Sequence, residues 1–172
     1  IVGSAAIAYS TPSTDIYSFQ RTYVDPDMWA PVTGYINPVL QSSTGIERAM
    51  NSELSGTSGT AFFQRIEQII SGQKPRGSSV VLSLDAAVQR AAYDALGDLE
   101  GAVVAIEPAT GRILAMVTSP SFDTNLLASH DTTIVDDTYA SLEADPLQPL
   151  INRTLDSLNP PASTFKLIVA AA

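Results

Sequence analysis

The fold is decided by the stretch Gly101-Ala102-Val103-Val104-Ala105-Ile106-Glu107-Pro108-Ala109-Thr110-Gly111-Arg112-Ile113-Leu114-Ala115-Met116-Val117-Thr118. Two apolar runs flank the segment 108–111, in which Pro and Gly stand where a tight turn prefers them. The sequence therefore predicts an antiparallel hairpin of residues 101–107 and 112–118. Because both runs are apolar at successive positions, we expect the hairpin to be covered on two sides. The predicted fold class is α+β, with an antiparallel sheet covered by helices.

A helix is expected directly before this hairpin. Residues 80–84 have the pattern of a strand, and the side-chain oxygen of Asp85 is placed to cap a helix over residues 86–96. Gly97 is placed to end that helix. Its inward face is predicted to consist of Val88, Ala92, Ala95 and Leu96. After the hairpin, residues 119–159 have the composition of loops, with a short helix expected near residues 137–143.

The first fifty residues have strand and turn patterns, which predicts a β-rich N-terminal domain. Residues 17–24 alternate and are rich in aromatics, and a second aromatic segment, residues 29–35, follows. Residues 60–70 then repeat apolar side chains at helical spacing. Residues 73–78, Gln-Lys-Pro-Arg-Gly-Ser, have the composition of a linker. We therefore expect two domains, residues 1–75 and residues 76–172.

Composition excludes several classes of function. The net charge of −9 disfavours nucleic acid as a partner, because such surfaces need clustered Lys and Arg. The absence of cysteine excludes disulfides, thiolate metal sites and a cysteine nucleophile, and one histidine cannot build a His-rich metal site. That histidine, His130, lies in a polar stretch and is expected to be a solvated loop residue rather than part of a catalytic triad. No cofactor and no metal are expected.

The motif that carries chemistry is Ser163-Thr164-Phe165-Lys166. Pro160-Pro161 precedes it and an apolar run follows, so Ser163 is predicted at the N-terminus of a helix with Lys166 one turn later on the same side. Ser71-Gly72-Gln73-Lys74 has the same spacing, but the glycine and the following Pro75 prevent a helical turn there. We interpret that second match as chance.

Ser163 could be a simple helix cap, since serine is common at that position. A capping box, however, has Glu or Gln at its third helical position, where this chain has Lys166. The helix around Lys166 is apolar on all sides, which predicts burial, and burial lowers the pKa of a lysine. A neutral lysine can accept the proton of a serine hydroxyl. Ser163 and Lys166 are therefore the predicted nucleophile and base.

The segment Asn159-Pro160-Pro161-Ala162-Ser163-Thr164-Phe165-Lys166 resembles the active-site serine motif of penicillin-binding proteins. The hairpin, together with Ser119-Pro120-Ser121-Phe122-Asp123, resembles the start of their transpeptidase domain. The resemblance covers nearly the whole chain and is to class B proteins of the actinobacterial penicillin-binding protein A type. Three further segments carry it: Ser43-Thr44-Gly45-Ile46-Glu47-Arg48-Ala49, Asn125-Leu126-Leu127-Ala128-Ser129-His130 and Leu150-Ile151-Asn152-Arg153.

The resemblance implies a peptidoglycan D,D-transpeptidase. Ser163 would attack the carbonyl between the two terminal D-alanines of a stem peptide, and a neighbouring amine would then take the acyl group. A β-lactam would leave a slow acyl-enzyme on Ser163. Residues 1–75 would be the non-catalytic, pedestal or dimerisation-like domain, and residues 76–172 the start of a transpeptidase domain with the serine β-lactamase-like fold. The resemblance also implies an extracytoplasmic location at the cell membrane, an anchor that precedes this chain, and partners among division or other cell-wall synthesis proteins.

Two features depart from the family pattern. The family usually has Gly directly before the nucleophile, where this chain has Ala162, and a positive φ there would strain an alanine. The Ser-x-Asn and Lys-Thr-Gly elements that follow the motif in the family are missing, and Ser157-Leu158-Asn159 precedes the nucleophile. We therefore expect a fragment of a longer protein, inactive alone. The alternatives are a β-lactam sensor or β-lactamase-like protein, and a non-catalytic scaffold that retains the fold.

Overall fold

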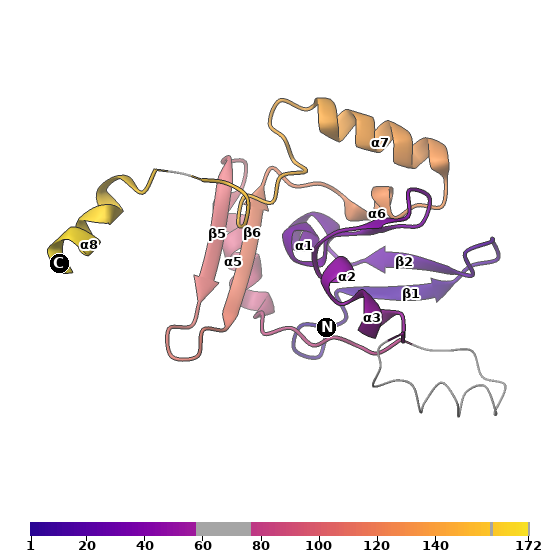
Figure 1. Cartoon of the computed structure of the whole chain (residues 1–172), viewed down its shortest axis with the longest axis horizontal. Helices are drawn as coiled ribbons and strands as arrows, with labels where there is room; N and C mark the ends of the chain where they lie inside the picture. The colour runs from indigo at the N-terminus through magenta and orange to yellow at the C-terminus, as the bar shows by residue number, and fades with distance from the viewer. Residues whose placement is uncertain (58–76, 159, 172) are drawn as a thin grey trace.

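The computed structural model describes residues 1–57, 77–158 and 160–171 (Figure 1). The elements of the first half are β1 (Ala8–Pro12), β2 (Phe19–Tyr23), α1 (Pro26–Thr33), β3 (Ile36–Asn37), β4 (Ser42–Ser43), α2 (Gly45–Ala49) and α3 (Asn51–Leu54). Those of the second half are α5 (Ala86–Leu96), β5 (Gly101–Ile106), β6 (Ile113–Ser119), α6 (Thr124–Leu127), α7 (Thr132–Ala144), the 3-10 helix η2 (Ala162–Phe165) and α8 (Lys166–Ala171). The three strand pairs formed by the named strands of the described residues are antiparallel, and the predicted α+β class is confirmed.

The predicted hairpin forms from β5 and β6. Gly101 pairs with Ser119 at its open end, and the pairing continues to Ile106 and Ile113 beside the turn. Gly111 has a φ of 74°, and its N–H donates to the Glu107 carbonyl over 2.8 Å. The turn therefore needs the glycine that the sequence provides, because a φ in this region strains other residues.

The expectation that the hairpin is covered on both faces is wrong for the described part of the chain. Helix α5 packs against β5 and β6 and covers one face (Figure 1). Side chains of β5 alternate between half-buried and exposed, and Val104 and Ile106 are among the exposed ones. Apolar side chains on both faces allow a strand to be buried on both faces. The second face is buried only where another element packs against it, and the described residues leave Val104 and Ile106 exposed.

Helix α5 has the predicted bounds and the predicted cap. The Asp85 carboxylate accepts from the N–H groups of Ala87 and Val88 over 2.8 and 3.0 Å. Its inward face was predicted incorrectly in part, because Val88 and Ala95 are exposed while Gln89 is completely buried. The predicted strand 80–84 also reduces to one bridge, in which Leu82 pairs with Val2.

The second aromatic segment of the first half is a helix, α1, and not a strand. Pro26 occupies its first turn, where a missing N–H does no harm, and Pro31 lies within it. Met28 and Trp29 point into a core that also contains residues from both halves of the chain. This core consists of Val2, Ile7, Met28, Trp29, Val32 and Leu84.

Two helices follow β6 where the sequence indicated mostly loop. The short helix expected near residues 137–143 lies within the longer α7, which Asp131 caps, and α6 was not predicted. Residues of α6 pack with Tyr23 and Tyr35 in a second core, so the two halves are in contact here as well.

The predicted helix 60–70 and the linker residues 73–76 lie outside the described residues, so the domain boundary at 75/76 stays a prediction. No helix in the described ranges is long and apolar enough to cross a membrane.

Candidate active site

Ser163 and Lys166 lie in one helical segment, as predicted. Pro160 and Pro161 lead into η2, and Lys166 begins α8. The Lys166 N–H donates to the carbonyls of Ser163 and Thr164, which joins the two helices. Residues three apart in a 3-10 helix lie on the same face. The backbone therefore places the Ser163 and Lys166 side chains on one side, although no hydrogen bond joins them in the described chain.

Ala162 adopts the backbone conformation that favours glycine. Its φ is 48°, and the preceding Pro161 has helical angles. The Thr164 N–H and the Thr164 hydroxyl both donate to the Pro161 carbonyl, which fixes this turn. The left-handed region costs a non-glycine residue about 1–2 kcal/mol. The strain anticipated for an alanine before the nucleophile is therefore present.

Lys166 is exposed, and the expected burial is wrong for this chain. The apolar side chains around it are exposed too, Leu167 by 76% and Ile168 by 63%. In the described chain α8 packs mainly against η2, and Figure 1 shows it standing away from the β5–β6 hairpin. An all-apolar helix is buried only where another surface meets it, and the described residues do not supply that surface.

The segment before the motif is fixed by two side chains that sequence reasoning passed over. The Asn152 amide donates to the Pro31 carbonyl of α1 over 2.8 Å. The Arg153 guanidinium is almost buried and pairs with Glu100 over 3.0 Å. Both residues belong to the quoted segment Leu150-Ile151-Asn152-Arg153, so the available signal was the resemblance and not the local pattern. They anchor the segment that leads into Ser163.

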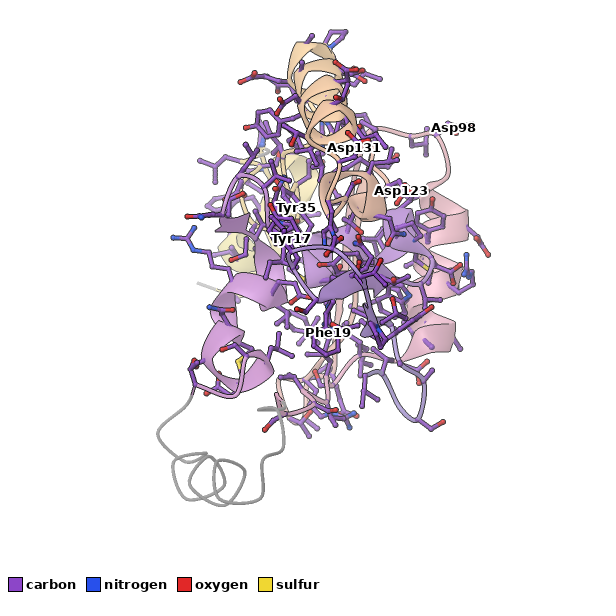
Figure 2. The ribbon with its side chains drawn as sticks, turned by 90° about the vertical axis from the view of Figure 1, so that its right-hand side faces the viewer. Tyr17, Phe19, Tyr35, Asp98, Asp123 and Asp131 are labelled. Carbon is purple, nitrogen blue, oxygen red and sulfur yellow. The ribbon has the colours of Figure 1, made fainter. Side chains whose placement is uncertain are left out.

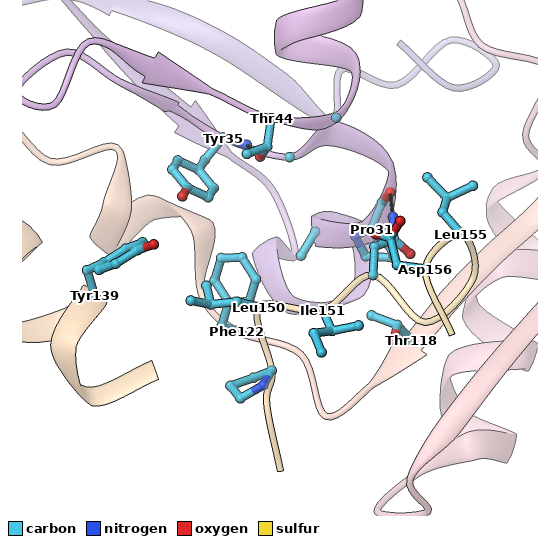
Figure 3. Close-up of a pocket in the computed structure, with 15 residues that line it drawn as sticks. Pro31, Tyr35, Thr44, Thr118, Phe122, Tyr139, Leu150, Ile151, Leu155 and Asp156 are labelled. Atoms are coloured by element: carbon cyan, nitrogen blue, oxygen red, sulfur yellow. Dashed lines mark hydrogen bonds between the residues drawn. The ribbon is translucent and has the colours of Figure 1, made fainter. Parts of the chain in front are cut away.

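A cavity of about 360 Å³ lies at the joint of the two halves and is distinct from Ser163 and Lys166 (Figure 3). Tyr35 and Thr44 line it from the first half, and Phe122 and Tyr139 from the second. Burial raises the pKa of the Tyr35 hydroxyl, and the neighbouring Tyr139 adds to that effect. Ser163 is exposed and does not line this cavity.

His130 is less solvated than predicted. It contacts the Asp15 carboxylate from the loop between β1 and β2. Its ring also packs on Tyr17, which is labelled in Figure 2, with centroids 4.6 Å apart. The hydrogen bond from His130 is the main reason that the pKa of Asp15 lies below its usual value. This contact ties the β1–β2 hairpin to the start of α7. Within the described ranges, no three His, Cys, Asp or Glu residues gather into a possible metal site.

Each half of the chain matches a known protein family. Residues 1–80 match the family described as penicillin binding protein A dimerisation domain, and residues 101–172 match the penicillin binding protein transpeptidase domain. The chain is 42% identical to the peptidoglycan D,D-transpeptidase PbpA of Mycolicibacterium smegmatis, with 99% of this chain and 35% of that protein covered. It is 33% identical to the peptidoglycan D,D-transpeptidase MrdA of Acinetobacter baumannii, with 93% and 27% covered.

Comparison with solved structures supports the same family. The penicillin G acyl-enzyme complex of penicillin-binding protein A from M. tuberculosis superposes with a TM-score of 0.95 at 40% identity, covering 99% of this chain and 40% of that one. The chain thus spans about a third of the length of the curated relatives that it matches. It belongs to the class B penicillin-binding proteins, in the penicillin-binding protein A branch.

Proposed function

We propose that the complete protein containing this chain is a peptidoglycan D,D-transpeptidase with Ser163 as its nucleophile. The Ser163 Oγ attacks the carbonyl carbon between two terminal D-alanines and its proton passes to Lys166 Nζ. The C–N bond then breaks, and the departing D-alanine leaves as an amine with that proton. A second amine then attacks the acyl carbon, the bond to Ser163 Oγ breaks, and the proton that the amine loses passes through Lys166 Nζ to Ser163 Oγ, which leaves the crosslink and a free serine hydroxyl. β-Lactams acylate Ser163 in the same first step and remain covalently bound to it.

The observation that supports this best is the η2–α8 turn. It holds a serine and a lysine three residues apart, on one side of a helical segment that lies inside the matched transpeptidase region. N–H groups at a helix start favour negative charge, so the Ser163 N–H is suited to stabilise the oxyanion. The solved acyl-enzyme complexes of penicillin-binding protein A from M. tuberculosis with penicillin G and imipenem support the proposed reaction with β-lactams.

Lys166 must be neutral to accept a proton, and burial favours the neutral form of a lysine. The proposal therefore requires that parts of the complete protein outside this chain cover α8 and Lys166. Lys166→Arg tests this, since guanidinium keeps the charge but does not lose its proton in proteins. We expect penicillin acylation of the complete protein to fall by far more than tenfold.

Lys74→Arg is the matched control, because Lys74 also follows a serine by three residues. It should leave the acylation rate unchanged. A Lys166→Arg protein that acylates within about tenfold of wild type, about 1.4 kcal/mol in barrier, would exclude Lys166 as the base. A wild-type protein that is never acylated would support the scaffold alternative instead.

We further propose that residues 1–75 form the non-catalytic domain and residues 76–172 the start of the transpeptidase domain. The description of the family matching residues 1–80 supports self-association of the first domain. The family also supports a location on the extracytoplasmic face of the cell membrane, with partners in cell division or wall synthesis. Peptidoglycan stem peptides are the proposed substrate.

A further inference from the structure

The two edges of the β1–β2 hairpin differ in how their backbone groups are used. Just outside the paired strands, the Val24 N–H donates to the Ile7 carbonyl over 3.0 Å, and the Ser13 N–H donates to the Ser18 carbonyl over 2.8 Å. Hydrogen-bonded pairs alternate with non-bonded pairs along an antiparallel ladder. With the observed register, the backbone groups of Ala8 and Ser10 must therefore point away from β2.

The outer edge of β2 is already occupied by side chains from the second half. The Asn125 carboxamide accepts from the Tyr23 N–H over 2.8 Å and donates to the Tyr23 carbonyl over 3.0 Å. The Gln20 amide donates to the carbonyls of Arg21 and Ala128, each over 2.8 Å. Three outward groups of this edge, the Tyr23 N–H and the carbonyls of Tyr23 and Arg21, therefore have side-chain partners, and the hairpin is held in place from that side.

The outer edge of β1 is open. Tyr9, Ser10, Thr11 and Pro12 are exposed, and the outward N–H and carbonyl groups of Ala8 and Ser10 meet no partner among the described residues. An edge strand with free backbone groups is a template for pairing with another strand, and proteins commonly protect such an edge with charged side chains. The sequence of β1, Ala-Tyr-Ser-Thr-Pro, carries no charge.

We propose that β1 pairs antiparallel with β1 of a second copy of this protein, with Ser10 on the two-fold axis. This rests on the proposed self-association of the first domain and assigns its surface. In this register Ser10 and the partner's Ser10 exchange two N–H···O bonds. Each Ala8 N–H also donates to the carbonyl of Pro12 in the other copy. The contact is isologous, so one strand supplies both sides of the interface.

Pro12 selects this register, because it offers a carbonyl outward but has no N–H to leave unpaired. Pairing also places Tyr9, which is 43% exposed, opposite Thr11 of the other copy. The uncharged strand favours a second copy as the occupant, because a chain with net charge −9 can approach itself most easily where no like charges meet. A cationic peptide would find no carboxylate on β1. We expect a weak, reversible dimer, because the strands are short.

Ser10→Pro tests the surface in the complete protein by sedimentation velocity over a concentration series. It removes the outward Ser10 N–H and the Ser10 hydroxyl, which accepts from Arg21 over 3.4 Å, but leaves the backbone hydrogen bonds between β1 and β2 intact. The dimer dissociation constant should therefore rise at least about tenfold. Ser10→Thr keeps the N–H and the hydroxyl and should dimerise as wild type does. Penicillin acylation of both variants reports that they are folded.

Because the chain has no cysteine, single cysteines give a second readout. Paired Ser10 residues would lie with Cα atoms about 5.5 Å apart, within disulfide reach, so Ser10→Cys should crosslink under mild oxidation. Thr11→Cys is the matched control, because the two copies of Thr11 would lie about 8 Å apart and should not crosslink.

A protein that stays monomeric at all concentrations overturns the inference together with the proposed self-association. A dimer that Ser10→Pro leaves unchanged, and that Ser10→Cys does not crosslink, overturns only the β1 surface.

Discussion

Gln89 joins helix α5 to α1 and to β6 through three buried hydrogen bonds, of which the one to Met28 crosses between the two halves, and its replacement by methionine tests these contacts. The Gln89 side chain donates to the carbonyls of Met28 over 3.0 Å and Met116 over 2.8 Å, and accepts from the Met116 N–H over 2.7 Å. It thereby joins α5 to α1 and to β6 in a completely buried position. Gln89→Met keeps the volume and the helix propensity but removes all three hydrogen bonds.

The expected loss of stability follows from the backbone groups left behind. Two carbonyls and one N–H lose their partner, and each unsatisfied buried group costs about 1–3 kcal/mol. Because the costs of neighbouring unsatisfied groups do not add fully, we expect Gln89→Met to lower the free energy of unfolding by about 3–5 kcal/mol. With a urea m-value of about 2 kcal/mol/M, the unfolding midpoint should fall by about 1.5–2.5 M. Urea titration followed by circular dichroism measures this shift.

Arg90→Met is the matched control on the next residue of α5. Arg90 also connects α5 to the first half, through an ion pair with Asp25 over 2.6 Å. Both side chains of this pair are about half exposed, at 46% and 50%, so its loss should cost less than about 1 kcal/mol. A Gln89→Met protein as stable as the Arg90→Met protein would refute the reasoning that these buried hydrogen bonds anchor α5 to α1 and β6.

Three further outcomes are expected. Ala162→Gly should relieve the left-handed strain and raise stability by about 1 kcal/mol, measured by thermal unfolding, and an unchanged or lower melting temperature would contradict it. Asp15→Asn should destabilise the chain at pH 7, and this effect should shrink as the pH falls below 3.8. A lowered pKa contributes stability above the unfolded value of 3.8, and that stability is lost as the pH falls through the lower folded value. Asp98→Asn, at an exposed aspartate away from His130, is its control, and equal effects at both pH values would oppose the role of the Asp15 contact. The isolated chain of residues 1–172 should not be acylated by penicillin, and a stoichiometric mass shift on it would refute that expectation.

Elements with strong local signals could be predicted from the sequence. The hairpin turn at Gly111 and the cap at Asp85 each depend on a few neighbouring residues, and both formed as expected. Helix α1 was missed because aromatic residues favour strands. The indication of a helix was Pro26, which is well suited to a first helical turn.

Features that depend on distant segments could not be predicted in this way. The amphipathic pattern of α5 predicts that the polar side chain of Gln89 points outward. In the structure it lies inside the core, where it forms hydrogen bonds with backbone groups of α1 and β6. The apolar sequence of α8 predicts burial of Lys166, but burial requires a covering surface that the described residues lack. Spacing alone located Ser163 and Lys166 on one helical segment, while their chemistry stays a prediction.

The most direct test of the proposed active site is the location of the penicillin adduct in the complete protein. Intact-mass spectrometry after incubation with penicillin should show one added acyl group, and peptide mapping should place it on Ser163. Ser163→Ala should remove the adduct while the thermal unfolding temperature stays unchanged. An adduct that persists in Ser163→Ala, or that maps to another residue such as Ser157, would contradict the assignment of Ser163 as the nucleophile.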